Sequence, residues 1–308
     1  MPQSSVRAKV SLCHRSICAL DAIHRYGYLG VRQVATMCSV NPKSASEILL
    51  RLQRGRLLGH FGNVGIRGFG KVPKVYYLTK FGHFVLAEER SAHGTEISPY
   101  RQPNISTRWS PLMFHRLDTL DVLASVERDC RRKPGYELID TLVEYRRERV
   151  GRRWRKETTD FVSKGSSPAE KIVPDAGFAV RHIASGKQAL FLIEVDRGTM
   201  RLSTGHYDED VASYVDKLAK YDRYLASGRV AERYPKLGYF SGFHLLTITN
   251  SERRIASMRK ASTASLAPKF HRFFRFSTLE KVRQNVLHND WVSRDRGDEN
   301  TYSLIKGK

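Results

Sequence analysis

Between residues 110 and 280, amphipathic helices alternate with short apolar runs, and this order restricts the possible folds more than any other property of the chain. Apolar side chains recur at helical spacing in three segments, 111–132, 207–225 and 252–264. Runs with strand character lie around them, at 136–145, 160–162, 176–181, 189–195, 243–249 and 273–277. The order predicts an α/β (α+β) domain in which helices flank a mixed sheet.

The first 95 residues carry a different pattern. Three short helices are predicted, at 12–26, 31–38 and 43–54, with Asn41 or Ser39 as the N-cap of the third and Pro42 at its first position. A basic, glycine-rich segment between two strands follows, which is typical of a β-hairpin. This order resembles a winged helix-turn-helix domain. The resemblance rests on Leu52, Gly55, Leu57, Tyr76, Tyr77, Leu78, Thr79 and Gly82.

A winged helix-turn-helix domain reads DNA bases with side chains near the N-terminus of its recognition helix. The candidate DNA-contacting residues of the third helix are Asn41, Lys43, Ser44, Ser46 and Arg51. The hairpin would offer cations to phosphates, namely Arg67, Lys71 and Lys74. The alternative is a winged helix that binds another protein.

The net charge is strongly positive, +22 from 53 Lys and Arg against 31 Asp and Glu. The first 100 residues and the remainder are both basic, so a basic tail does not explain the charge. Such a field attracts polyanions, and double-stranded DNA is the expected partner. No apolar stretch is long enough to span a membrane, and the first residues lack the apolar segment of a secretory signal. We therefore expect a cytoplasmic protein.

The domain boundaries follow from composition. A segment with three prolines and little periodicity predicts a linker at 96–110, between a winged helix at 1–95 and the α/β domain at 111–285. Residues 286–308 are expected to form a C-terminal tail. The four cysteines lack zinc-type spacing and are expected to be reduced thiols.

Three carboxylates are expected to meet at one end of the sheet. Glu194 and Asp196 are two apart in a strand and share a face. Asp175 begins the preceding strand, and the HIASGKQ turn predicts an antiparallel pair. Uncompensated carboxylates in one place are costly, and a divalent cation, Mg²⁺ or Mn²⁺, would relieve that cost. Asp175, Glu194 and Asp196 are thus predicted metal ligands, with Glu144 or Glu127 as alternatives for a further one.

This pattern resembles the PD-(D/E)xK nuclease superfamily. Pro174 and Asp175 match its Pro-Asp pair and Glu194 its second acidic residue, whereas Asp196 stands where the lysine is usual. Some members take that lysine from the next helix, where Lys217 lies. The resemblance implies a nuclease-like fold with Asp175, Glu194, Asp196 and Lys217 as catalytic residues. A bound Mg²⁺ would activate water, and Lys217 would stabilise developing charge.

The whole combination is similar to the replication-relaxation family of plasmids and integrative elements. The similarity covers most of residues 15–250 and is strongest at EVDRGT and at the following Lys217, Leu218 and Tyr221. It implies a DNA-processing protein linked to plasmid or mobile-element replication, with replication or transfer proteins as further partners. We expect it to nick or process DNA.

Two alternatives remain open. One is a non-catalytic replication initiator or transcriptional regulator with a degenerate nuclease fold, which the missing Glu-x-Lys lysine favours. The other is a protein-docking platform. For Asp196 and Arg197 themselves, the alternative is an ion pair at the end of a strand without a chemical role.

One further segment, RRERVGRRWRK at 146–156, interleaves cations with Trp154 and follows Tyr145. It suits a surface that tracks a DNA backbone, with Arg152 and Arg153 as contacts. The alternative is a solvated hairpin tip.

Overall fold

The computed structural model divides into two compact units, Met1–Leu117 and Asp118–Lys308. The boundary lies inside helix α5 (Pro111–Arg131), a few residues after the start predicted for the second domain. The residues that the structure describes are 12–62, 65–66, 70–71, 73–100, 111–163, 167–198, 200–202, 213–235, 237–265, 268–288 and 290–305.

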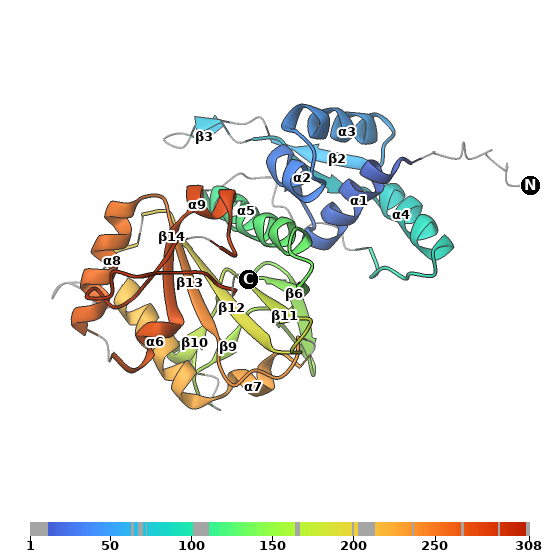
Figure 1. The fold of residues 1–308 in the computed structure, drawn as a ribbon. Helices are drawn as coiled ribbons and strands as arrows, with labels where there is room; N and C mark the ends of the chain where they lie inside the picture. The colour runs from blue at the N-terminus through green and yellow to red at the C-terminus, as the bar shows by residue number, and fades with distance from the viewer. Residues whose placement is uncertain are drawn as a thin grey trace, which may run out of the picture. The chain divides into compact units, whose positions relative to one another are not determined.

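The first unit combines helices with a small antiparallel sheet (Figure 1). In the sheet, β5 lies between β1 and β2, with Leu29 opposite Tyr76 and Leu58 opposite Leu78. A second pair of short strands, β3 and β4, lies between β2 and β5 in the chain. The elements in order are α1 His14–Tyr26, β1 Leu29–Gly30, α2 Val31–Met37, α3 Pro42–Arg54, β2 Leu58–Phe61, β3 Gly65–Ile66, β4 Gly70–Lys71, β5 Val75–Leu78 and α4 Lys80–Ala92.

The local chemistry of this unit explains its turns. Helix α1 ends at Gly27, whose φ of +75° favours glycine. Asn41 caps α3 by accepting a hydrogen bond from the Ser44 backbone N–H at 2.8 Å. At Gly82, a Cβ atom would lie 2.0 Å from the Leu57 carbonyl oxygen, so only glycine allows this approach of α4. The three predicted helices are confirmed, whereas α4 was not predicted.

The second unit is built on a seven-stranded mixed sheet in the order β16-β15-β14-β13-β12-β11-β6. The central strands β12, β13 and β14 are parallel, and the outer pairs are antiparallel. The strands are β6 Tyr136–Val143, β11 Ala176–His182, β12 Gln188–Asp196, β13 His244–Thr249, β14 Phe274–Thr278, β15 Trp291–Ser293 and β16 Thr301–Tyr302. The α/β prediction and the antiparallel pairing of β11 with β12 are therefore confirmed.

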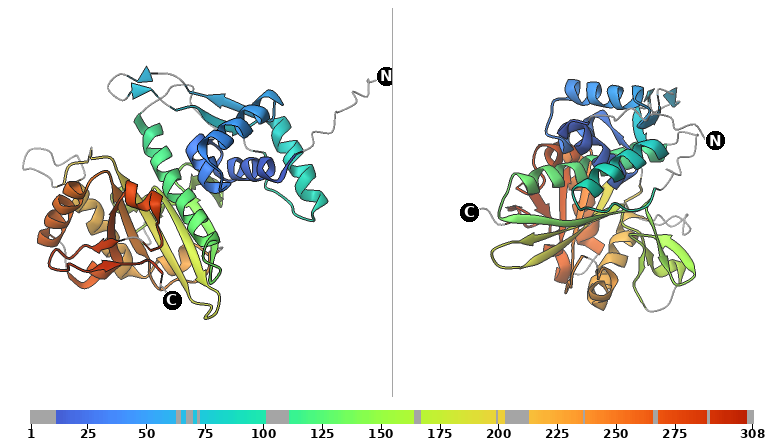
Figure 2. Two further views of the ribbon diagram at one scale, coloured as in Figure 1. Left: turned by 45° about the horizontal axis from the view of Figure 1, so that its top comes forward. Right: turned by 90° about the vertical axis from the view of Figure 1, so that its right-hand side faces the viewer.

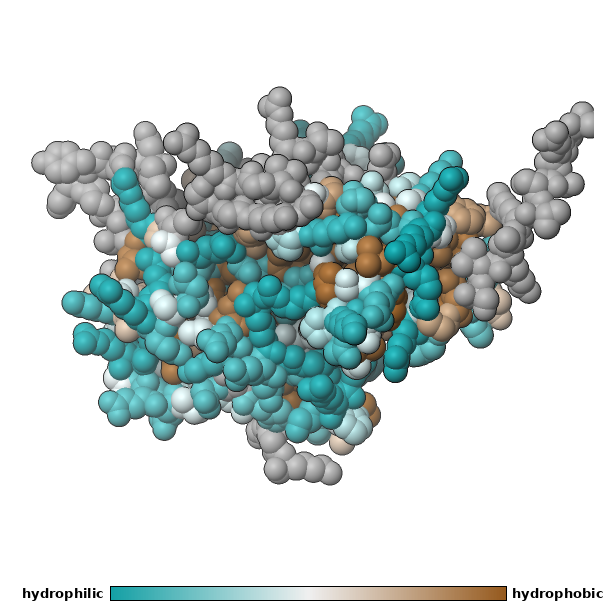
Figure 3. All heavy atoms as spheres, turned by 90° about the horizontal axis from the view of Figure 1, so that it is seen from above, coloured by the Kyte–Doolittle hydropathy of each residue, from teal (hydrophilic) through white to brown (hydrophobic). Residues whose placement is uncertain are grey.

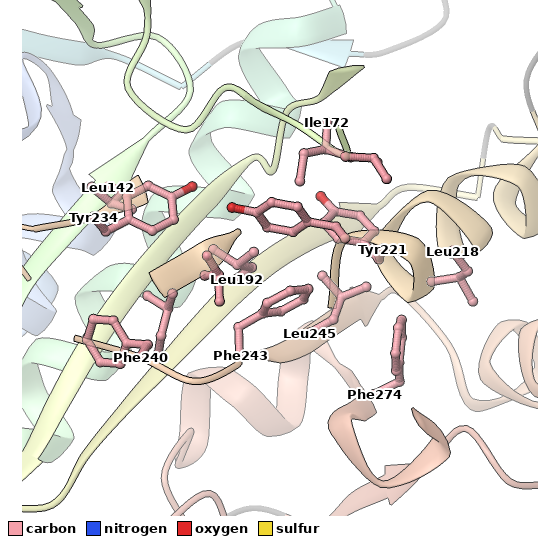
Figure 4. Packing of buried hydrophobic residues seen from close by; sticks show 14 of the residues in the cluster. Leu142, Ile172, Leu192, Leu218, Tyr221, Tyr234, Phe240, Phe243, Leu245 and Phe274 are labelled. Carbon is pink, nitrogen blue, oxygen red and sulfur yellow. The ribbon is translucent and has the colours of Figure 1, made fainter. Parts of the chain in front are cut away.

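Helices cover both faces of this sheet (Figure 2). One face packs against α6 Tyr214–Ser227, α7 Val230–Arg233 and α8 Glu252–Ser265, around a core of leucine and aromatic side chains (Figure 4). The other face lies against α5 and α9 Leu279–Gln284, which are joined by an ion pair between Arg283 and Asp121. Alternation along β12 directs Leu192 and Glu194 to the α6 face.

Several elements of the second unit differ from the sequence expectation. Residues 160–162 were predicted as a sheet strand, but β9 Asp160–Phe161 pairs only with β10 Lys171–Ile172, apart from the main sheet. Strands β7 Arg147–Val150 and β8 Arg153–Lys156 form a separate hairpin. The prediction of a C-terminal tail at 286–308 is wrong, because β15 and β16 extend the sheet and Trp291 is fully buried.

Two properties of the described residues bear on partners. None of the helices they form combines the length and the apolar character that crossing a bilayer requires. On the face shown in Figure 3, hydrophilic side chains prevail and hydrophobic ones lie among them in smaller groups.

Candidate functional site

Asp175 and Glu194 come together because two neighbouring strands hold them. Asp175 lies just before β11, where its backbone N–H donates to the Ile193 carbonyl at 3.0 Å. Its carboxylate Oδ2 accepts a hydrogen bond from the Val195 N–H at 2.8 Å. Asp175 is thus bound to the residues on both sides of Glu194 in β12, and the convergence expected for these two carboxylates is present.

Glu194 is buried, with 4% of its surface exposed, and two side chains of α6 donate to it. The Lys217 ammonium donates to Oε2, and the Tyr221 hydroxyl donates to Oε1. Residues four apart lie on the same face of a helix, so Lys217 and Tyr221 reach one carboxylate together. Figure 4 shows Tyr221 on α6 next to the apolar side chains of the core.

The N-terminus of α6 is fixed by a capping box. Ser213 accepts a hydrogen bond from the Asp216 N–H at 3.2 Å, and the Asp216 carboxylate accepts from the Ser213 N–H at 2.9 Å. The helix therefore begins one turn before Lys217. On the same face of α6, the hydroxyl groups of Tyr214 and Thr247 are 3.2 Å apart, and Thr247 is the parallel-strand neighbour of Glu194.

Burial and neighbouring charges shift the pKa values of Glu194 and Lys217. Burial raises the pKa of Glu194 above its usual value and the charge of Asp175 adds to the rise, whereas the Lys217 ammonium acts against it and favours the ionised carboxylate. Burial lowers the pKa of Lys217, but the negative charges of Glu194 and Asp175 outweigh that effect and the pKa is raised above its usual value. Lys217 is therefore a cation at neutral pH, held beside two carboxylates.

Asp196 has a different environment from Glu194. Its Oδ2 accepts a hydrogen bond from Arg254 Nε of α8 at 2.7 Å, and the Arg254 guanidinium also donates to the Met200 carbonyl. The alternative of an ion pair between Asp196 and Arg197 is wrong, because Arg197 pairs with Asp118 of α5. Asp196 is thus part of an ion pair, but its partner is Arg254 of α8, 58 residues later in the chain.

Asp175 and Glu194 fit a magnesium ion only if water or phosphate oxygens supply its other ligands. No group of three or more His, Cys, Asp or Glu side chains arranged to bind a metal occurs among the described residues. Mg²⁺ usually binds through one or two carboxylates and completes its octahedron with water or phosphate oxygens. Asp175 and Glu194 supply that number. Glu144 lies opposite Asp175, donating its backbone N–H to the Asp175 carbonyl, but its carboxylate pairs with Lys156.

The candidate DNA contacts of α3 have mixed environments. Lys43 is exposed, and Ser44 and Ser46 are half-buried. The Asn41 side-chain oxygen serves as the N-cap. Arg51 donates to Ser16 Oγ of α1 at 2.9 Å, so its guanidinium also connects two helices.

The hairpin candidates are described only in part. Lys74 donates to Gln53 Oε1 at 2.9 Å and lies over the Tyr76 ring. Arg67 and the side chain of Lys71 lie outside the described residues. In the second unit, Arg152 and Arg153 are exposed at the turn of the β7–β8 hairpin.

Sequence reasoning gave no role in the site to two residues that shape it. Tyr221 was named only for the family similarity, although its position four residues after Lys217 in an amphipathic helix places it on the same face. Arg254 could not have been found, because nothing in the local sequence pairs it with an aspartate 58 residues earlier.

Comparisons with known proteins extend this description. A family model described as replication-relaxation matches residues 20–238, which includes Asp175, Glu194, Asp196 and Lys217. No curated protein matches the chain. Among solved structures, the YusO protein from Bacillus subtilis is similar at 18% identity, with 37% of this chain and 74% of that chain covered and a TM-score of 0.23. A TM-score that low supports no conclusion about fold or function.

Proposed function

Because the chain belongs to the replication-relaxation family, we propose that it binds double-stranded DNA and nicks it. The nicking site would be formed by Asp175, Glu194 and Lys217 and would use a divalent cation. Membership ties the protein to the replication of a plasmid or mobile element. The observation that carries the proposal of cleavage is the contact of the buried Glu194 with Lys217, next to Asp175 at the start of the neighbouring strand.

Each residue has a role in this proposal. Asp175 and Glu194 would hold Mg²⁺ or Mn²⁺, which when bound supplies a Lewis acid for water and for the phosphoryl group. Lys217 places a positive charge beside the carboxylates, where it stabilises the charge that develops on a phosphoryl oxygen. Tyr221 orients Glu194. Asp196 is neutralised by Arg254, so we assign it a structural role in place of metal ligation.

The first unit would locate the DNA. Three helices followed by a sheet with a basic, glycine-rich connection support a winged helix-turn-helix domain. Lys43, exposed next to the N-terminus of α3, is the best-placed described side chain for contact with DNA. Replication or transfer proteins are further proposed partners, on the strength of family membership alone.

A second candidate function is a non-catalytic DNA-binding initiator or regulator. It is favoured by the compensation of charge at the site. Lys217 and Tyr221 occupy both oxygens of Glu194, and Arg254 neutralises Asp196. A site of this kind is stable without a metal ion.

Supercoiled plasmid incubated with the protein and Mg²⁺ or Mn²⁺ distinguishes the two functions. We expect the wild type to produce open circles, and Asp175→Ala, Glu194→Gln and Lys217→Ala to reduce the rate at least 100-fold, which corresponds to about 2.7 kcal/mol of transition-state stabilisation. Lys220→Ala, a lysine on the same helix, is the matched control and should cleave like the wild type. Duplex binding without cleavage in any variant would favour the initiator or regulator.

A further inference from the structure

The β7–β8 hairpin exposes a large aromatic ring among cations. Trp154 of β8 has 62% of its surface exposed and lies directly opposite Arg149 of β7. Because side chains alternate along a strand, Arg147 and Arg149 share a face with Trp154. Both arginines are exposed. We call this the outer face of the hairpin.

The opposite face holds the hairpin to the body of the unit. Glu148 Oε1 accepts hydrogen bonds from Arg155 Nε at 2.8 Å and from Arg233 Nη2 at 2.7 Å. Arg233 also donates to the Thr159 carbonyl at 3.0 Å. At the base, Arg146 Nε pairs with Glu157 Oε2 at 3.0 Å. These contacts hold the β7–β8 hairpin to the rest of the unit, so the exposed Trp154 lies on an element that is fixed in place.

The exposed Trp154 ring between arginines indicates which kind of ligand this face can bind. Tryptophan is usually largely buried, and an exposed ring flanked by arginines is suited to a ligand that offers both a flat π surface and negative charge. Single-stranded DNA has both, since its bases can stack on an aromatic ring while its phosphates pair with arginine. Bases inside an intact duplex are already stacked and cannot cover the ring.

We propose that the outer face of the β7–β8 hairpin binds unpaired DNA, with a base stacked on Trp154 and phosphates held by Arg147 and Arg149. The proposal rests on the proposed function in taking DNA as the substrate, and it adds that part of this DNA is single-stranded. It also assigns Trp154 as the residue that distinguishes single strands from duplex.

The hairpin adjoins the carboxylate site. Lys156, the last residue of β8, pairs with Glu144, and the Glu144 N–H donates to the Asp175 carbonyl at 3.0 Å. A single strand held on the outer face would therefore lie on a hairpin whose base is linked to Asp175 through Glu144.

The test measures binding of the full chain to a fluorescein-labelled 20-nucleotide oligo(dT) and to a labelled duplex, by anisotropy at fixed salt. We expect Trp154→Ala to weaken oligo(dT) binding about 5- to 150-fold, the loss of one stacked base, and to leave duplex binding unchanged. Trp154→Phe should retain most of the affinity because it keeps an aromatic ring. Tyr239→Ala removes another strongly exposed aromatic residue and is the matched control.

Tryptophan fluorescence provides a second readout. In a Trp109→Phe background the remaining tryptophans are Trp154 and the fully buried Trp291, so quenching by oligo(dT) reports on Trp154. The quenching should disappear when Trp154→Phe is added. This measurement does not depend on the affinity of the variant.

The outcomes separate the two proposals. Unchanged oligo(dT) affinity in Trp154→Ala, or an equal loss for oligo(dT) and duplex, overturns the assignment of base stacking to Trp154. A wild-type protein that binds neither DNA overturns the proposed function itself. Thermal unfolding of each variant identifies misfolding. In that case quenching by oligo(dT) in the Trp109→Phe protein, which keeps Trp154, decides, and its absence overturns the proposal.

Discussion

At the residue scale, Glu194 is a buried acidic side chain whose burial needs compensation. A carboxylate in an apolar core loses its hydration, and this loss is offset only by donors that the fold supplies. Lys217 and Tyr221 are those donors, both from α6. The lysine supplies a charge that chemistry can use, whereas the tyrosine supplies only orientation and a hydrogen bond. The two roles can be separated by substitution.

Tyr221→Phe removes the hydroxyl and keeps the ring. We expect it to lower the free energy of unfolding by about 1.5–3 kcal/mol, because one oxygen of a buried carboxylate loses its partner. Urea unfolding at pH 7 measures this value. Tyr239→Phe, at an exposed position, should change it by less than about 0.5 kcal/mol. Equal stabilities of the two variants would contradict the role assigned to Tyr221.

His244 predicts a dependence of stability on pH. Its ring lies 5.5 Å from the rings of both Phe191 and Phe273. Burial lowers the pKa of His244 from 6.5 to about 4, and the charges of Arg275 and Arg272 act in the same direction. The unfolded chain therefore binds more protons between these values, so His244 costs no stability above pH 6.5 and an increasing amount as the pH falls towards 4.

The measurement is urea unfolding at pH 7.5 and pH 4.5 for the wild type and for His244→Phe. The difference in unfolding free energy between the two pH values should be smaller in the variant, because it has no proton to gain. An identical difference would show that other groups produce the dependence on acid.

At the scale of elements, Asn41 at the N-terminus of α3 is a candidate for two functions, capping the helix and contacting DNA. Asn41 was predicted both as a possible cap and as a DNA contact, and its side-chain oxygen accepts from the Ser44 N–H. We expect Asn41→Ala to lower the unfolding free energy by about 1 kcal/mol and Asn41→Asp to preserve it, since aspartate caps equally well.

Duplex affinity separates the cap from a contact with DNA. If Asn41 acts only as a cap, Asn41→Asp weakens binding only through its added negative charge, and this difference should shrink as salt is raised. A loss in Asn41→Asp that persists at high salt would indicate that the amide itself contacts a base.

At the scale of the whole molecule, the C-terminal residues are part of the second unit. Trp291 is fully buried, and the buried Arg294 donates to Asp222 of α6 at 2.8 Å. Deletion of residues 286–308 would expose the edge of β14 and leave Asp222 without this guanidinium. We expect the truncated chain to lose its cooperative unfolding transition for the second unit, measured by circular dichroism, while the first unit retains its own. A true tail could be removed without effect.

Periodicity and composition predicted the class of fold, three helices of the first unit and the main strands, whereas Asp175, Glu194 and Lys217 were grouped by the resemblance to the PD-(D/E)xK superfamily. These features depend on spacing within short segments, which is visible in a linear chain. The partners that give each charge its role were decided by the tertiary structure. Arg254 reaches Asp196, and β15 and β16 join the sheet, because packing brings distant segments together. No local pattern encodes such contacts, which arise only when a common core is buried.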